Sequence, residues 1–272
     1  GIRTKHLDAI TSSFTALLAA RRFSPDVIHI HGVGIALLAP VARILYPRTK
    51  LVVTFHCMDR RFSKWGWFAR LSFRIGEWMT CLFAHEVITV SEELKRYCAT
   101  TYGREASYIS HAFSFERPAD RSAADARLAS FGLEPQRYFL FVGRLLAHKG
   151  AHRFLNAFNR ARQEAPEAFA NVKAVIVGGS SFTDQYAKDI EGLIRTTPNT
   201  LALGEKFDVD LRAIQAGALA HVFPTTEEGL SLSLLEASSS GRPVIVHDIE
   251  ANREATGGYA LTIDATDQDA LV

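Results

Sequence analysis

The feature of this sequence that most constrains its fold is a repeated alternation of short apolar runs with longer segments of helical periodicity. Ten apolar runs rich in β-branched residues are predicted as strands: 26–32, 50–56, 86–91, 107–112, 137–143, 172–179, 200–204, 220–225, 243–248 and 259–264. Segments with helical periodicity lie between most of them, at 33–46, 66–84, 149–164, 184–195, 208–219 and 231–240. Nearly continuous apolar strands joined through helices are typical of parallel sheets covered on both faces. The pattern therefore predicts an α/β protein.

The alternation is interrupted once, by the polar segment 113–136. This segment contains Pro118, Pro135 and only one short helical stretch, a composition typical of a domain junction. It predicts two α/β domains, 1–114 and 115–272, with a cleft between them. Right-handed crossovers would bring the carboxyl ends of the strands in each domain to one edge, where α/β proteins bind ligands.

Length and cysteine usage narrow the class of protein. The chain has 272 residues, of which 47% are hydrophobic, and this is ample for packed cores. The sequence contains no run of 18 or more apolar residues, so it predicts no membrane-spanning helix. Cys57, Cys81 and Cys98 have neither metal-ligand nor disulfide spacing, and so sparse a set favours a reducing compartment. We therefore expect a cytoplasmic protein.

The charge is divided unevenly between the two halves. Residues 1–120 contain 16 Lys and Arg against 10 Asp and Glu, whereas residues 121–272 contain 15 against 19. A basic N-terminal half suits an anionic partner, such as a membrane surface or a phosphorylated lipid. Uneven solvation of the two halves is the alternative.

One segment of the basic half, 59–83, interleaves basic and aromatic side chains. The basic residues are Arg60, Arg61, Lys64, Arg70 and Arg74, and the aromatic residues are Trp65, Trp67, Phe68, Phe73, Trp78 and Phe83. Basic, Trp-rich amphipathic sequences can lie in a membrane interface. The alternative is an ordinary domain helix with Phe73, Trp78 and Phe83 in the core. Nucleic acid is disfavoured as a partner, because no nucleic-acid motif accompanies the charge.

The stretch 141 FVGRLLAHKG 150 is the first candidate binding site. It combines a strand end, a loop with Arg144, and Lys149-Gly150 at the start of a predicted helix. Free N–H groups at a helix N-terminus attract anions, and two cations beside it would neutralise a diphosphate. Two solvated basic residues after a strand are the alternative.

The stretch 227 EEGLSLSLLEASSSGRP 243 is the second candidate. Glu228 and Gly229 would form the turn after a strand, Ser231 or Ser233 would cap a helix, and Glu236 would lie one to two turns into it. A carboxylate can accept two hydroxyl hydrogen bonds at once, which suits the vicinal diols of sugars and ribose. A glutamate in an ordinary surface pair is the alternative for Glu236.

His56 ends a predicted strand of the first domain, at 52 VVTFH 56. An imidazole at the sheet edge could assist a reaction or orient a hydroxyl, although histidines at strand ends are more often structural hydrogen bonders. The other histidines show no metal-ligand spacing such as HExxH. No metal site is therefore expected.

Taken together, these motifs resemble one enzyme family over essentially the whole chain. The order is VGR-x4-KG, a strand ending in Gly-Gly, E-x7-E before a small-residue helix, and GRPV. This order resembles the retaining glycosyltransferases of family 4. The stretches 52 VVTFHCMDRRFSKWG 66 and 87 VITVSEELKRYCATTYGREASYI 109 are most similar to the branch that includes bacterial rhamnosyltransferases of surface-polysaccharide assembly.

The resemblance implies a fold and an activity. The fold is GT-B, with two facing Rossmann-like domains: 1–114 on the acceptor side and 115–272 binding the nucleotide sugar. The activity is transfer of rhamnose or another hexose from a nucleotide-diphosphate sugar to a lipid-linked or polysaccharide acceptor, with retention of configuration and without metal or cofactor. Such a protein would be cytoplasmic, with peripheral contact to the inner face of the membrane.

The resemblance also implies roles for individual residues. Donor-binding residues are Arg144 and Lys149 at the diphosphate, Glu236 at the ribose diol, and Gly229, Leu230 and Ser231 near sugar and phosphate. Glu228 is the carboxylate near the donor sugar, and His56 lies near the reacting centre, so both are expected to be catalytic. Asp59 and Arg60 are assigned to the acceptor side.

The sequence departs from the family pattern in several places. The family often has Phe-Gly after Glu-Gly, whereas here the run is Gly229-Leu230-Ser231. His111-Ala112 stands where Asn-Gly is usual, and Cys57 where Gly is common. The family's opening strand and closing helix would lie outside residues 1–272, so the resemblance implies a chain shortened at both ends. A non-catalytic nucleotide-sugar-binding or scaffold module is one alternative. A GT-B sugar-nucleotide epimerase is another, although the spacing of Glu228 and Glu236 argues against it.

Overall fold

The computed structural model describes residues 8–62, 65–113, 118, 120–179 and 184–272. The chain forms two compact units, Gly1–His111 with Glu228–Leu230, and Ala112–Glu227 with Ser231–Val272. Lys64 and part of the predicted junction at 113–136 lie outside the described residues.

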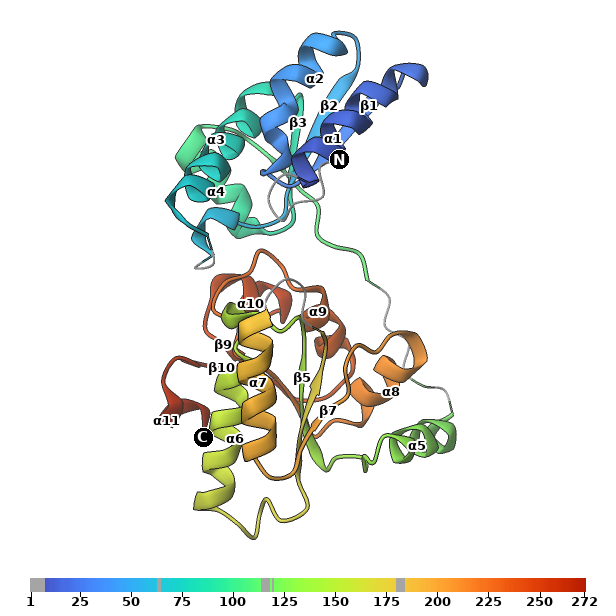
Figure 1. Cartoon of the computed structure of the whole chain (residues 1–272), viewed down its shortest axis with the longest axis vertical. Coiled ribbons are helices and arrows are strands. Elements are labelled where there is room, and N and C mark those ends of the chain that lie inside the picture. The colour runs from blue at the N-terminus through green and yellow to red at the C-terminus, as the bar shows by residue number, and fades with distance from the viewer. Residues whose placement is uncertain (1–7, 63–64, 114–117, 119, 180–183) are drawn as a thin grey trace. The chain divides into compact units, whose positions relative to one another are not determined.

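The N-terminal unit is built on a four-stranded parallel sheet of order β1-β2-β3-β4. Figure 1 labels β1, β2 and β3 of this sheet. Its strands are β1 (Val27–His31), β2 (Lys50–Phe55), β3 (Glu86–Thr89) and β4 (Ser107–Tyr108). The α-helices are α1 (Asp8–Ala19), α2 (Ala39–Leu45), α3 (Trp67–Phe83) and α4 (Glu92–Tyr102), and the short 3₁₀ helices are η1 (Ala20–Arg22), η2 (Ile35–Leu38) and η3 (Asp59–Arg61). The predicted helix 33–46 is divided into η2 and α2, with Pro40 in the first turn of α2, where proline is tolerated.

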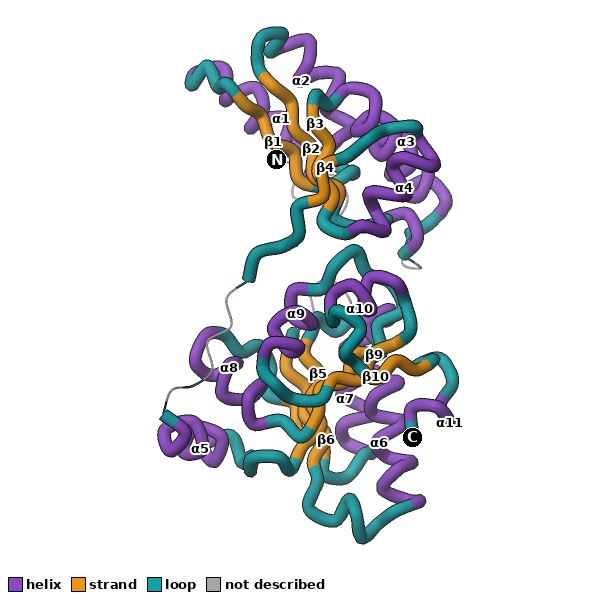
Figure 2. The backbone as a smooth tube through the Cα atoms, turned by 180° about the vertical axis from the view of Figure 1, so that it is seen from behind, coloured by secondary structure: helices purple, strands orange, loops and turns teal. Residues whose placement is uncertain are grey.

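The C-terminal unit is built on a six-stranded parallel sheet of order β10-β9-β8-β5-β6-β7. Its strands are β5 (Tyr138–Val142), β6 (Lys173–Val177), β7 (Thr200–Ala202), β8 (Ala220–Phe223), β9 (Val244–His247) and β10 (Leu261–Ile263). The helices are α5 (Arg121–Ser130), η4 (Ala147–Lys149), α6 (Ala151–Glu164), α7 (Asp184–Thr196), α8 (Asp208–Gly217), α9 (Leu232–Ser239), α10 (Glu250–Ala255) and α11 (Gln268–Leu271). Figure 2 shows helices on both sides of these strands.

Alternate residues of the central strands form two cores, one on each face of the C-terminal sheet. Phe141 and Ile176 pack with α6 and α7 on one face. Tyr138, Leu140 and Val175 pack with α5 and α8 on the other face. Because successive strand side chains point to opposite faces, an uninterrupted apolar run can fill both cores. The predicted α/β class with covered parallel sheets is confirmed.

The ten predicted strands are all present, mostly one or two residues shorter at their ends, and 107–112 contracts to the two-residue β4. In register, β4 pairs with β3 at Ser107 and Tyr108, and the N–H of Ile109 donates the last bond, to the carbonyl of Thr89 at 2.9 Å. Among the described residues, no helix is long and apolar enough to cross a membrane.

A buried ion pair joins three elements of the N-terminal unit. The side chain of Glu77 on α3 is fully buried, and its Oε2 accepts hydrogen bonds from Arg60 Nε at 3.2 Å, Tyr97 Oη at 2.8 Å and Tyr102 Oη at 2.6 Å. Arg60 Nη2 also donates to Tyr97 Oη at 2.7 Å. Burial and the bond to Glu77 raise the pKa of Tyr102. The carboxylate thereby fixes η3 and α4 on α3.

Replacing Glu77 with Gln should destabilise the protein by about 3 kcal/mol, because Arg60 would lose the counter-ion of a buried pair. Urea denaturation would measure the loss. The control is Glu92→Gln on α4, whose carboxylate is 45% exposed and lies 3.8 Å from Lys95 Nζ; exposed pairs contribute less than about 1 kcal/mol. Equal costs for the two substitutions would contradict this account of the cluster.

Candidate functional site

The C-terminal sheet reverses its strand order between β5 and β8. From β5 the chain adds β6 and β7 on one side, and it then adds β8, β9 and β10 on the other. The loops that follow β5 and β8 therefore leave the sheet in opposite directions from neighbouring strands. A reversal of this kind is where open parallel sheets bind ligands. The loops after β5 and β8 contain most of the residues that the sequence singled out.

The loop after β5 presents both predicted cations. Arg144 is exposed and Lys149 is partly exposed at the end of η4. Gly150 then precedes α6 with a φ of 80°, a left-handed conformation that favours glycine. The predicted helix start at Lys149-Gly150 is thus one turn of 3₁₀ helix followed by an α-helix from Ala151.

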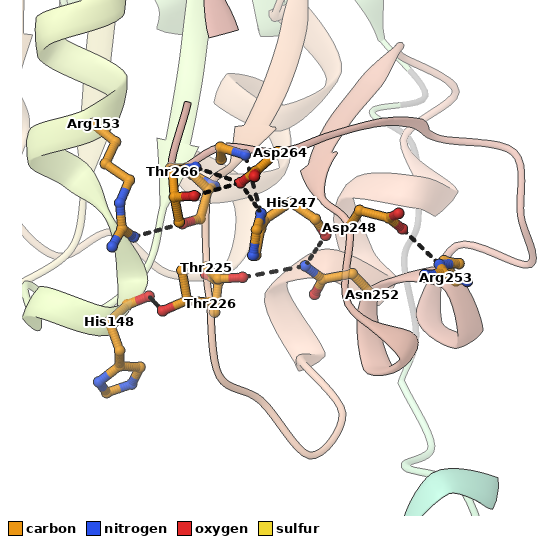
Figure 3. Close-up of polar contacts among 12 residues, drawn as sticks. His148, Arg153, Thr225, Thr226, His247, Asp248, Asn252, Arg253, Asp264 and Thr266 are labelled. Carbon is orange, nitrogen blue, oxygen red and sulfur yellow. Dashed lines mark hydrogen bonds and ion pairs between the residues drawn. The ribbon is translucent and has the colours of Figure 1, made fainter. Parts of the chain in front are cut away.

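Several contacts hold this loop against the end of β8 (Figure 3). A Cβ at Gly150 would lie 2.6 Å from the carbonyl oxygen of Pro224, so only glycine allows the approach. Arg153 Nη1 donates to the same oxygen at 3.1 Å. The N–H of Thr226 donates to the carbonyl of His148 at 3.0 Å. The glycine is therefore required by packing between two loops as well as by its own backbone.

Glu236 lies in the second turn of α9. Its Oε2 accepts a hydrogen bond at 3.3 Å from Nε2 of Gln215, a buried residue of α8. Ser231 is the N-cap of α9, as predicted, but its side chain makes no capping bond. Its Oγ lies 3.5 Å from Oγ of Ser233 instead. Glu236 is partly exposed, and the neutral amide of Gln215 holds its carboxylate in place.

The predicted donor residues do not all fall in one unit. Arg144, Lys149, Ser231 and Glu236 belong to the C-terminal unit, whereas the loop Glu228–Leu230 groups with the N-terminal unit. Glu228 is partly exposed, while Gly229 and Leu230 are buried. The C-terminal unit thus contains the two cations and Glu236.

Sequence reasoning missed the residues that support these loops. Asn252 on α10 is buried, and its Nδ2 donates to the carbonyl of His247 at 2.9 Å and to that of Thr225 at 3.4 Å (Figure 3). Nδ1 of His247 accepts from the N–H of Ala265 at 3.0 Å. These bonds connect the ends of β8, β9 and β10. The only sequence signal was an amide in the first turn of a short helix after a strand.

The N-terminal sheet ends in a row of histidines. His29 and His31 lie on the same side of β1, and their ring centroids are 4.0 Å apart. Nδ1 of His31 lies 3.2 Å from Nε2 of His56, which follows β2. The ring of His56 also stacks on that of His111, which follows β4, at 5.5 Å and 11°. His56 therefore makes a structural hydrogen bond and also lies at the carboxyl edge of the N-terminal sheet.

Burial and the neighbouring imidazoles favour the uncharged form of His56. Burial lowers its pKa most, and His111, His31 and His29 lower it further. A neutral imidazole has one donor and one acceptor nitrogen. Because Nε2 faces His31, Nδ1 is the nitrogen that remains for a ligand. His31 and His111 are far from His56 in the sequence, and only the fold joins them to it.

The predicted acceptor-side residues lie on η3, which begins three residues after His56. Arg60 uses two of its nitrogens on Glu77 and Tyr97, and its guanidinium lies 5.7 Å from the centre of the Tyr97 ring. Asp59 is partly exposed. Arg60 thus has a clear structural role, and its role toward an acceptor stays a prediction. Within the described residues, no group of three or more His, Cys, Asp or Glu could hold a metal ion.

Two family models match the chain. The model described as Glycosyl transferases group 1 matches residues 136–272, and that described as Glycosyltransferase Family 4 matches residues 2–113. The chain is 24% identical over 219 residues to the O-antigen chain mannosyltransferase RfbU of Salmonella typhimurium, covering 79% of this chain and 57% of that protein. It is 25% identical over 242 residues to glycogen synthase of Mycobacterium tuberculosis, covering 86% and 55%. The chain thus spans little more than half the length of these two curated relatives.

Solved structures share the fold. A structure of Anabaena HepE in complex with UDP-glucose matches 89% of this chain and 64% of its own, with a TM-score of 0.73 and 20% identity. Sucrose-phosphate synthase from Thermosynechococcus elongatus matches 99% and 68%, with a TM-score of 0.79 and 20% identity. The predicted GT-B class is confirmed.

The pKa of His56 should lie below 6.5, since burial and three neighbouring imidazoles disfavour its charged form. Because the folded state then binds the proton less tightly than the unfolded chain, this group should reduce stability as the pH falls through 6.5. NMR titration of the imidazole nitrogens would measure the pKa. His111→Asn should raise it toward 6.5 and leave the pKa of His85, lowered by burial and Arg43, unchanged. An unaltered His56 titration would contradict the coupling to His111.

Proposed function

The chain belongs to the glycosyltransferases of group 1 and family 4, and from this membership we propose that the whole protein transfers a sugar from a nucleotide-diphosphate sugar to a glycan acceptor, with retention of configuration. Relatives named as O-antigen mannosyltransferases and glycogen synthase support a hexose as the transferred group. Mannose and rhamnose are the sugars to test first, in the assembly of a surface polysaccharide.

One observation carries the proposal: two cations, a helix N-terminus and a carboxylate share the edge of the C-terminal unit at the point of strand reversal. Arg144 and Lys149, with the positive end of the α6 dipole directly after them, form an electropositive surface suited to a diphosphate. Such groups would bind the donor and would also stabilise the charge that builds on the departing diphosphate. These protein groups would neutralise the charge of the diphosphate without a metal.

Glu236 is proposed to bind the ribose of the donor. Its bond from Gln215 orients the carboxylate without neutralising it, because an amide carries no charge. A carboxylate oriented in this way can still accept hydrogen bonds from two vicinal hydroxyls. The backbone of Gly229, Leu230 and Ser231, and the carboxylate of Glu228, are proposed to approach the donor sugar.

The N-terminal unit is proposed to receive the acceptor. His56, neutral at pH 7, would offer Nδ1 to a hydroxyl near the reacting carbon, and Asp59 and Arg60 follow it in the chain. The acceptor is proposed to be a lipid-linked or polysaccharide glycan, which would place the protein in the cytoplasm, in peripheral contact with the inner face of the membrane.

Isothermal titration with UDP, GDP and dTDP would test the donor site and identify the base. Lys149→Ala should weaken binding of the preferred nucleotide by about 10-fold to 100-fold, as expected for the loss of a charge-assisted bond. Glu236→Ala should weaken binding of a ribonucleotide by about 10-fold. The loss of affinity should be smaller for the matching 2′-deoxynucleotide, which lacks one hydroxyl of the diol.

The matched controls are Lys188→Ala and Glu191→Ala, two exposed residues of α7, and both should bind as the parent chain does. Unchanged affinity in the Lys149 and Glu236 variants would refute the proposed donor site. Product analysis with a nucleotide sugar and a lipid-linked glycan would then separate a transferase from a protein that only binds the nucleotide.

A further inference from the structure

Helix α3 presents an apolar stripe to solvent along its whole length. The aromatic members are strongly exposed: Trp67 at 78%, Phe68 at 68% and Trp78 at 54%. The other exposed members are Leu71, Ile75 and Leu82. At 3.6 residues per turn, these six side chains fall within an arc of about 100°.

The face of α3 that packs on the rest of its unit is small and polar at its centre. The buried residues of the helix are Gly76, Glu77, Thr80 and Cys81. A surface helix of a globular protein normally buries its apolar stripe and exposes its polar one. Trp78, which the core interpretation placed inside, lies outside, while Phe73 and Phe83 are half-buried. The apolar stripe is therefore not the face by which the helix packs on its unit, and its exposure has to be explained separately.

Packing fixes the orientation of the helix. A Cβ at Gly76 would lie 2.1 Å from the carbonyl oxygen of Val33, so the backbone of α3 lies directly against that segment. Glu77 is held on the same side by Arg60 and two tyrosines. The helix cannot turn its apolar stripe inward without breaking this ion pair and this close contact.

All the exposed charged residues of α3 are positive. Arg70 and Arg74 are exposed, and Arg74 borders the apolar stripe near Trp67 by helical position. Glu77, the single acidic residue of α3, is buried and paired with Arg60. Tryptophan with adjacent arginine, around an apolar band, suits the boundary between lipid tails and anionic headgroups.

We propose that the exposed face of α3 docks on an anionic lipid membrane, with the helix lying in the plane of the surface. The six apolar side chains would enter the boundary between headgroups and acyl chains, and Arg70 and Arg74 would pair with lipid phosphates. The 17-residue helix would lie along about 25 Å of the surface. Membrane binding by this surface would be a property additional to glycosyl transfer, because it needs neither donor nor acceptor.

Co-sedimentation with vesicles tests the surface directly. The protein should bind vesicles of phosphatidylcholine and phosphatidylglycerol more tightly than vesicles of phosphatidylcholine alone. Trp67→Ser with Trp78→Ser should weaken binding by at least about 10-fold, since two apolar anchors are lost. Arg70→Gln with Arg74→Gln should weaken binding to anionic vesicles by about five-fold for each arginine and leave neutral vesicles unaffected.

The matched control removes two exposed aromatic residues of the C-terminal unit, Phe207 (68% exposed) and Tyr259 (96% exposed), by substitution with Ser. This variant should bind vesicles as the parent chain does. Circular dichroism and the melting temperature should show that all the variants fold, because every substituted side chain is exposed.

Three results would overturn the proposal: no binding of the parent chain to anionic vesicles, equal loss in the control, or undiminished binding by the tryptophan variant. Light scattering adds a separate check. If the parent chain is a dimer that does not bind vesicles, and the tryptophan variant is a monomer, the exposed face of α3 would bind a second copy of the chain. Nucleotide titration is independent of all these outcomes, so failure here would leave the donor site untouched.

Discussion

The pairing of β5 with β8 is the contact on which the candidate site depends. Parallel pairing of Phe139 with Ala220 and of Leu140 with His221 brings together two strands that are separated by about 80 residues of chain. The loops after them then meet, and the tight approach of Gly150 to Pro224 fixes their spacing. Without that pairing, Arg144 and Lys149 would be two unrelated surface cations, and Glu236 an ordinary helix carboxylate.

Much of this architecture could be predicted from the sequence because its strands are buried on both faces. A run such as 138 YFLFV 142 supplies Tyr138 and Leu140 to one core and Phe141 to the other, so it is apolar at every position. Such runs identify strands and parallel sheets locally. Strand order is a different matter, since it depends on contacts between segments far apart in the chain. The reversal at β5 and β8 therefore had to come from the structure.

The same distinction explains what sequence reasoning missed around the sites. Asn252 connects the ends of β8 and β9, and His111 stacks on His56, yet no local pattern links either residue to its partners. The orientation of α3 is a third case. Periodicity showed an amphipathic segment with basic and aromatic residues, but it could not show which face was buried. Glu77 and Gly76 decide that, through Arg60, Tyr97 and Val33, which lie on other elements.

The two sheet edges differ in their charge in a way that suits different ligands. At the C-terminal edge, Arg144 and Lys149 stand before a helix N-terminus, and all three features attract anions. At the N-terminal edge, burial lowers the pKa of His29, His56 and His111, which favours the uncharged form of these three imidazoles. A protonated row would compete for a diphosphate, whereas a neutral one offers only hydrogen bonds to hydroxyls. The crowding of these histidines therefore suits the roles proposed above, in which this edge binds a hydroxyl group and the C-terminal edge binds the diphosphate.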